Sequence, residues 1–177
     1  MSGIDDRNPV ILIREALLRC PDEFPPADTA ELNFVQDEEL RQSLRIDLAA
    51  IQKAISNGEY KAATVIAGSI VETLLLWKLE QQDPTKISNA VSALASKNIS
   101  LPKASGPLDK WDLHHYVEVA YEMRLIKEQT AKSMRLAKDF RNLIHPGRAQ
   151  RLGQVCDIGT AHTAIGAVFN LIRDLTR

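Results

Sequence analysis

Apolar residues recur at intervals of three and four through most of this 177-residue chain, and that spacing is typical of amphipathic α-helices. Residues 37–57 give the clearest case, because Gly58 follows them as a helix C-terminal cap. Their apolar positions are Leu40, Leu44, Leu48, Ile51 and Ile55. No stretch alternates apolar and polar residues between turn residues, so a β-sheet is not expected. The pattern predicts an all-α chain, and its short connections favour an antiparallel helical bundle.

Residues 59–82 are predicted to form the central helix of the bundle, because positions 62–79 are apolar nearly all round. Ala63, Ala67 and Gly68 would let neighbouring helices approach closely. The longest apolar run, residues 62–77, is shorter than the roughly 20 residues that span a bilayer, and Glu72 lies inside it. A buried helix is therefore expected rather than a membrane span.

Further helices are predicted at residues 9–20, between Pro84 and residue 100, and at residues 108–125, 128–144 and 155–176. Prolines at positions 21, 25 and 26 indicate a connecting loop, and Pro146 with Gly147 is expected to end the 128–144 helix. The buried stripe of the last helix is predicted to consist of Ile158, Ala161, Ile165, Val168, Phe169 and Ile172. The chain thus divides into an N-terminal helix with a Pro-rich connecting loop (1–36) and a helical bundle (37–177).

The apolar content of 45% is enough for one core without disulfides or a structural metal. The two cysteines, Cys20 and Cys156, form no C-x-x-C pair, and no Cys/His cluster has zinc-ligand spacing. The chain also lacks the short motifs of common nucleotide-binding, hydrolase and metalloprotease sites. Its first ten residues are acidic and carry no apolar run before a cleavage site. We therefore expect a cytoplasmic protein with no metal, no cofactor and no membrane attachment.

A net charge of −1 conceals a strong asymmetry along the chain. Residues 1–50 hold 11 acidic and 5 basic side chains, whereas residues 124–151 hold 8 basic and 2 acidic ones, which is −6 against +6. Within the basic segment, Lys132, Arg135 and Arg148 are candidates for binding RNA. The alternative is that this segment pairs with the acidic N-terminal region of the same chain or of a partner subunit.

The segment KDFRNLIHPGR at residues 138–148 has the most informative polar pattern. On a continuous helix, one apolar arc would contain Leu136, Phe140, Leu143 and Ile144, and the opposite side would carry Lys138, Arg141, Asn142 and His145. Arg141 and His145 are i, i+4 neighbours, so the guanidinium and the imidazole could reach one phosphate. The alternative is structural: Arg141 is solvated or ion-paired, and His145 caps the helix C-terminus.

This segment, together with the apolar helix AATVIAGSIVETLLLWKLE, resembles the HEPN superfamily of small helical bundles. The resemblance covers roughly residues 37–176 in helix order, and residues 141–146 are its specific part. It implies that Arg141, Asn142 and His145 match the family's arginine, polar neighbour and histidine. It also implies that Glu72 matches an acidic residue on an inner helix.

Many members of that superfamily are metal-independent ribonucleases whose composite site forms across a homodimer, and the resemblance implies the same for this chain. Three residues separate Arg141 from His145, where the family pattern has four to six. A one-residue deletion rotates a helical side chain by about 100°. Related bundles without activity serve as dimerisation, sensor or antitoxin-like modules in antiviral defence or toxin–antitoxin systems. Both a ribonuclease and such a module, with a partner protein, are open at this point.

Glu72 and a pair of histidines raise two further questions. Glu72 stands in the most apolar helix and needs a partner, which could be Arg141 or a local group such as the Thr64 hydroxyl. His114 and His115 point about 100° apart on a helix, so they cannot readily bind one metal ion. With Trp111 and Tyr116 they form either a stacking surface for bases or one half-buried helix face.

Overall fold

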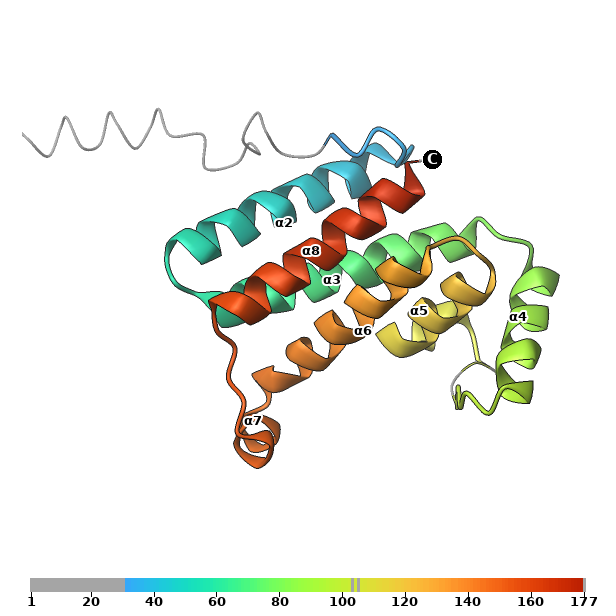
Figure 1. Cartoon of the computed structure of the whole chain (residues 1–177). Coiled ribbons are helices and arrows are strands. Elements are labelled where there is room, and N and C mark those ends of the chain that lie inside the picture. Colours follow the sequence, from blue (N-terminus) through green and yellow to red (C-terminus); the bar gives the residue numbers. More distant parts are fainter. Residues whose placement is uncertain (1–30, 103, 105, 177) are drawn as a thin grey trace, which may run out of the picture.

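The computed structural model describes residues 31–102, 104 and 106–176, and every regular element in these ranges is a helix (Figure 1). The α-helices are α2 (Glu38–Ser56), α3 (Tyr60–Glu80), α4 (Pro84–Ser96), α5 (Leu113–Glu122), α6 (Glu128–Arg141), α7 (Pro146–Leu152) and α8 (Ile158–Leu175). Two single-turn 3₁₀ helices, η1 (Leu108–Lys110) and η2 (Asn142–Ile144), precede α5 and α7. The all-α prediction is confirmed for this part of the chain. The helix predicted at residues 9–20 lies outside it.

Helix α3 is the central element, as its all-round apolar pattern predicts. It contacts α2, α5, α6 and α8. Its buried residues are Ala63, Thr64, Ala67, Gly68, Ile70, Val71, Leu74, Leu75 and Leu79. By length and composition alone, α3 could cross a membrane. Because its buried residues face four other helices, α3 has the contacts of a core helix in a bundle.

Four long helices lie side by side in the bundle, with α2 and α6 running one way and α3 and α8 the other (Figure 1). The turn from α2 to α3 is short because Gly58 adopts a left-handed conformation with φ of 74°. The other end of α2 begins at Asp37, whose side chain accepts a hydrogen bond from the Leu40 amide. Helix α4 stands apart at the end of α3, where it contacts α5.

The helix predicted at residues 108–125 is wrong in its extent. Residues 108–110 form η1, and Trp111 and Asp112 are extended before α5 begins at Leu113. The Tyr116 hydroxyl donates a hydrogen bond to the Leu108 carbonyl at 2.6 Å, which ties η1 to α5. Arg124, with φ of 59°, ends the segment in a left-handed turn.

The helix predicted at residues 128–144 is also wrong at its end, and α7 was not predicted. Helix α6 ends at Arg141, η2 covers residues 142–144, and His145 is extended with ψ of 113°. A proline disfavours helical geometry in the residue before it, and its own fixed φ suits the first turn of a helix. Pro146 therefore starts α7 rather than simply ending α6.

The apolar arc predicted from Leu136 to Ile144 is correct at Leu143, which is buried, and wrong at Leu136. Leu136 is 50% exposed, whereas the buried residues of α6 are Thr130, Ala131, Met134 and Ala137. Arg141 continues that buried stripe at helical spacing, so it faces α3 instead of projecting away from the core. On α8 the buried positions include Ala161, Ala164 and Ala167, while Ile158 and Phe169 are 52% and 46% exposed. Small residues are buried here because α8 packs directly against α3 and α6.

Candidate functional site

Arg141 crosses from α6 to α3 and forms an ion pair with Glu72. Its Nη1 atom donates to Glu72 Oε2 at 2.6 Å. The aliphatic part of the Arg141 side chain lies on Gly68, where an added Cβ would meet Arg141 Cδ at 2.8 Å. Gly68 is thus the residue on α3 that leaves room for the arginine. Of the two partners considered for Glu72, Arg141 and the Thr64 hydroxyl, the structure therefore shows Arg141.

The Arg141–Glu72 pair lies at the margin of the core. The Arg141 side chain is 35% exposed and the Glu72 side chain is 30% exposed. Thr64, the local alternative for Glu72, instead donates to the Tyr60 carbonyl one turn earlier at 2.8 Å. Glu72 therefore holds the guanidinium in place from one side, and solvent can reach the pair.

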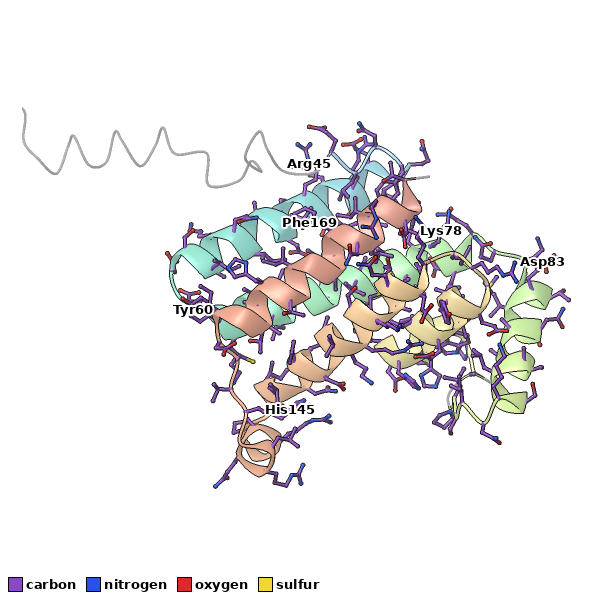
Figure 2. All side chains as sticks on the ribbon, in the orientation of Figure 1. Arg45, Tyr60, Lys78, Asp83, His145 and Phe169 are labelled. Atoms are coloured by element: carbon purple, nitrogen blue, oxygen red, sulfur yellow. The ribbon has the colours of Figure 1, made fainter. Side chains whose placement is uncertain are left out.

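His145 is exposed and lies at the turn between α6 and α7 (Figure 2). Its backbone carbonyl accepts hydrogen bonds from the amides of Arg148 and Ala149 at 2.9 and 3.0 Å. This is the N-cap position of α7 and not the C-terminal cap of α6. Arg141 and His145 are not i, i+4 neighbours on one continuous helix, because η2 separates them and His145 itself has an extended backbone.

Asn142, Lys138 and Arg148, three of the predicted site residues, line a polar pocket of about 370 Å³ between α5, α6 and α7. The complete lining is Pro102, Asp112, Leu113, His114, His115, Lys138, Asp139, Asn142 and Arg148. Arg141 and His145 are outside this lining. The predicted residues therefore do not form one cluster. Arg141 and Glu72 pair against α3, whereas Asn142, Lys138 and Arg148 line the polar pocket, and the exposed His145 belongs to neither group.

Glu118 on α5 and Arg135 on α6 form an ion pair between the two helices. The guanidinium donates to both carboxylate oxygens at 2.7 Å, and the Glu118 side chain is only 5% exposed. Burial alone would raise the pKa of Glu118, but the hydrogen bonds and charge of Arg135 bring that pKa below its ordinary value. Arg135, predicted to bind RNA, is thus held by a structural partner.

His114 lies one turn before Glu118 on α5, with its Nδ1 atom 3.7 Å from Glu118 Oε1. Burial lowers the pKa of His114. The neighbouring charges of Lys138 and His115 also lower this pKa, whereas the charge of Glu118 raises it. The lowered pKa favours the neutral imidazole. The role of His114 in lining a polar pocket was not foreseen from the sequence.

The other aromatic residues near His114 do not form a stacking surface. Trp111, His115 and Tyr116 are 6%, 2% and 2% exposed, so they belong to the core. Burial, with nearby carboxylates adding to it, raises the pKa of Tyr116 to about 12. Of the two alternatives for this cluster, the packed helix face is the one observed.

Three other basic side chains, Lys132, Lys138 and Arg148, form local ion pairs. Lys132 lies 2.7 Å from Glu128, while Lys138 and Arg148 lie 3.5 and 4.0 Å from Asp139. Lys132 is 67% exposed, so its pair with Glu128 is a weak surface contact. These pairs leave Lys132 accessible to a polyanion.

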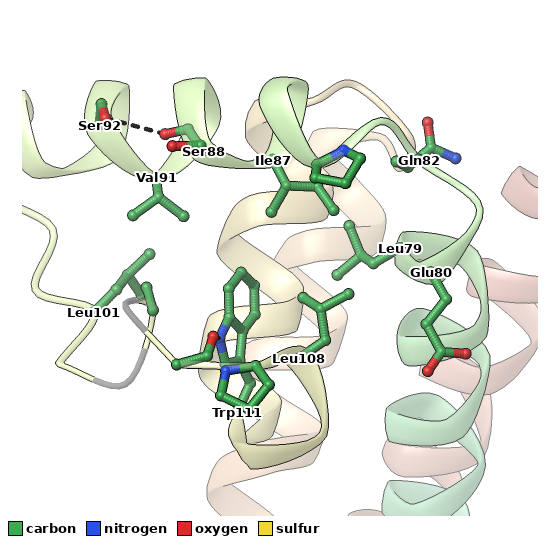
Figure 3. Close-up of a pocket in the computed structure, with 14 residues that line it drawn as sticks. Leu79, Glu80, Gln82, Ile87, Ser88, Val91, Ser92, Leu101, Leu108 and Trp111 are labelled. Carbon is green, nitrogen blue, oxygen red and sulfur yellow. Dashed lines mark hydrogen bonds between the residues drawn. The ribbon is translucent and has the colours of Figure 1, made fainter.

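A second pocket, of about 690 Å³, lies between α4 and the loop that leads to η1 (Figure 3). Its walls are mainly apolar, and they include Leu79, Ile87, Val91, Leu108 and Trp111. The Trp111 indole donates to the Gly106 carbonyl at 3.2 Å, which fixes the ring against this loop. Residues 100–107 contain two prolines and a glycine, which is typical of a loop, but nothing in their sequence indicates a cavity beneath it.

Within the described ranges, no three His, Cys, Asp or Glu residues lie where they could hold a metal ion together. The Cys156 thiol lies 3.8 Å from the Phe140 carbonyl, and burial raises its pKa. Comparison of the chain with protein-family models, with curated proteins and with solved structures found no match.

Proposed function

We propose that the chain is a HEPN-like, metal-independent endoribonuclease that cleaves RNA as a homodimer in the cytoplasm. The observation that supports this most is the Arg141–Glu72 pair, which presents a guanidinium one-third exposed at the end of α6. A solely structural arginine needs no exposure, whereas a group that stabilises a phosphate must be reached by it. The exposed His145 follows four residues later.

In this mechanism the ribose 2′-hydroxyl attacks the adjacent phosphorus, forming the O2′–P bond and breaking the P–O5′ bond. His145 accepts the proton of the 2′-hydroxyl, or delivers one to the leaving 5′-oxygen, while water exchanges the other proton. Arg141 stabilises the charge that develops on the phosphate oxygens, and Glu72 keeps the guanidinium oriented. Asn142 orients one of these groups, with Lys138 adding positive charge nearby.

Exposed apolar side chains on α6, on α7 and at the start of α8 support the homodimer. Leu136 is 50% exposed on α6, Leu152 is 52% exposed at the end of α7, and Val155 is 70% exposed in the following loop. Ile158, at the start of α8, is 52% exposed. Large apolar side chains that gather on a surface are often covered by a partner. A second copy bound here would bring two candidate sites together.

Cleavage of single-stranded RNA by the purified full chain tests the proposal. Arg141→Ala should weaken both cleavage and RNA binding, His145→Ala should abolish cleavage with binding largely kept, and a chelator should change neither. His162→Ala is the matched control, because His162 is an exposed histidine on α8. Intact RNA after hours with wild type, together with a lower melting temperature of Arg141→Ala, would contradict the enzymatic role.

The second candidate is a non-catalytic HEPN-like interaction or sensor module in a defence or toxin–antitoxin assembly. The observation that favours it is the apolar pocket beside Trp111, whose volume suits a small molecule or a side chain of a partner protein. Val91→Trp would fill that pocket. If the chain is such a module, this change should abolish partner binding while leaving the melting temperature within a few degrees.

A further inference from the structure

The polar pocket between α5, α6 and α7 shares Asn142 and Lys138 with the proposed cleavage site, but its other polar side chains, among them His114, Asp139 and Arg148, have no part in that chemistry. We propose that this pocket binds one ribonucleotide of a single-stranded RNA, with Arg148, Lys138, Asn142 and His114 on its phosphate and Asp139 on its ribose hydroxyls. The inference rests on the proposed function, since it identifies how the same RNA is held beside the cleavage site.

Two side chains of the pocket have unused hydrogen-bonding capacity. Among the described residues, the buried Nε of Arg148 and the buried Nδ1 of His114 have no hydrogen-bond partner. Arg148 Nη2 lies 4.0 Å from Asp139 Oδ1, and His114 Nδ1 lies 3.7 Å from Glu118 Oε1, which are too long for hydrogen bonds. Buried polar groups are rarely left unsatisfied, so each such group requires an explanation. A phosphate that contacts Arg148 would supply one for its Nε atom, and a His114 ring protonated by that phosphate would donate its Nδ1 proton to Glu118.

The pocket also combines charges of both signs. Lys138 and Arg148 flank Asp139, with Lys138 Nζ 3.5 Å from its carboxylate, and Asp112 lies on the same lining. Two cations and two carboxylates give no net attraction for a simple anion. They do match a ribonucleotide, because its phosphate oxygens only accept hydrogen bonds while its ribose hydroxyls also donate them. The 2′-hydroxyl is the group that distinguishes RNA from DNA at such a site.

His114 makes the pocket sensitive to pH. Its Nδ1 atom is buried against Glu118, and the side chain is 37% exposed, which leaves the opposite edge of the ring for the pocket. Burial lowers the pKa of His114. Lys138 and His115 oppose its protonation, whereas Glu118 and Asp112 favour it. A bound phosphate would favour the protonated ring, which could then donate to the phosphate and to Glu118 together. RNA affinity should therefore rise as the pH falls toward the lowered pKa of His114.

The experiment is fluorescence anisotropy with a labelled ten-nucleotide RNA, using the full chain in a His145→Ala background so that the RNA stays intact. Arg148→Gln and His114→Gln should each raise the Kd about fivefold or more. Lys86→Gln, which removes an exposed cation on α4, should change the Kd less than twofold. DNA of the same sequence should bind at least threefold more weakly than RNA.

Equal Kd values for Arg148→Gln and Lys86→Gln would overturn the pocket, and equal affinity for RNA and DNA would overturn the ribose contact. Asn142→Ala provides a second test if His114→Gln lowers the melting temperature, because it removes a pocket amide without touching α5. Pocket-dependent binding without cleavage by wild type would support the pocket and contradict the enzyme. Cleavage that requires Arg141 and His145, with all three pocket variants unchanged in affinity, would support the enzyme and contradict the pocket.

Discussion

Arg141 on α6 and Glu72 on α3 meet across 69 residues of sequence, with Nη1 of the guanidinium 2.6 Å from Oε2 of the carboxylate. The contact needs Gly68 one turn before Glu72, because a larger residue there would collide with the arginine stem. The packing of α6 on α3, the space left by Gly68 and the charge of Glu72 together hold the Arg141 guanidinium where solvent reaches it. Both the ion pair and the glycine beneath it have measurable consequences for stability.

The Arg141–Glu72 pair should contribute only modestly to stability. Both side chains are about one-third exposed, so solvent screens the attraction, and a double-mutant cycle with Glu72→Gln and Arg141→Gln should give a coupling of about 0.5–1 kcal/mol. Urea unfolding at low salt measures it. A coupling of several kcal/mol would mean that the pair is a structural element rather than an accessible functional one.

Gly68→Ala and Gly166→Ala should change stability in opposite directions. Both glycines lie inside helices, and alanine is favoured there by about 0.5–1 kcal/mol. A Cβ at Gly166 meets nothing within 4 Å, so Gly166→Ala should raise the melting temperature. At Gly68 the Cβ would displace Arg141, so Gly68→Ala should destabilise the protein by about 1 kcal/mol. Thermal unfolding of the two variants is the comparison, and equal stabilisation would show that the arginine packs elsewhere.

Removing Arg135 should produce a pH-dependent loss of stability. Arg135→Met leaves the Glu118 carboxylate buried without its bidentate partner, which should lower the free energy of unfolding by about 2 kcal/mol. This cost is below the usual cost of breaking a buried ion pair, because the Arg135 side chain is 36% exposed. The pKa of Glu118 is lower in the folded state than the ordinary 4.5. The stabilisation is therefore present above about pH 4.5 and is lost as the pH falls through the folded-state pKa. Urea unfolding of both proteins at pH 7 and pH 3.5 should show the difference shrinking, and a constant difference would contradict it.

Self-association should depend on the exposed apolar residues of α6, α7 and the start of α8. Leu152→Glu should raise the dimer dissociation constant about tenfold or more, because it places a charge in the proposed contact. Ile46→Glu is the control, since Ile46 is similarly exposed but lies on α2. Sedimentation at several concentrations measures both. A monomeric wild type at tens of micromolar would rule out the proposed dimer.

The sequence predicted the parts of the fold whose signals are local. Helix α2 could be placed because its apolar residues recur at helical spacing and Gly58 permits a left-handed turn after its end. Helix α3 was recognisable as central from its all-round apolar composition. The junction of α6 and α7 was missed because Pro146 is compatible with ending one helix and with starting another, and local sequence does not decide between them.

The buried face of α6 could not be predicted because side-chain size is a poor guide where helices approach closely. Leu136 is exposed while Ala131 and Ala137 are buried, and Arg141 lies on the same buried stripe. The partnership of Arg141 with Glu72 was nevertheless one of two foreseen alternatives, since a carboxylate in an apolar helix requires a partner. The polar pocket was not foreseeable, because its lining comes from three helices whose packing no local pattern encodes.

The most direct test of the proposed activity is the single-turnover cleavage rate of a single-stranded RNA by the full chain, with analysis of the product ends. The proposed mechanism predicts 2′,3′-cyclic phosphate ends, formed equally with and without chelator. It also predicts a rate for His145→Ala that is about 10²-fold or more below wild type, the usual contribution of one proton-transfer group. His162→Ala should match wild type. Intact RNA with wild type, or cleavage that His145→Ala leaves unchanged, would contradict it.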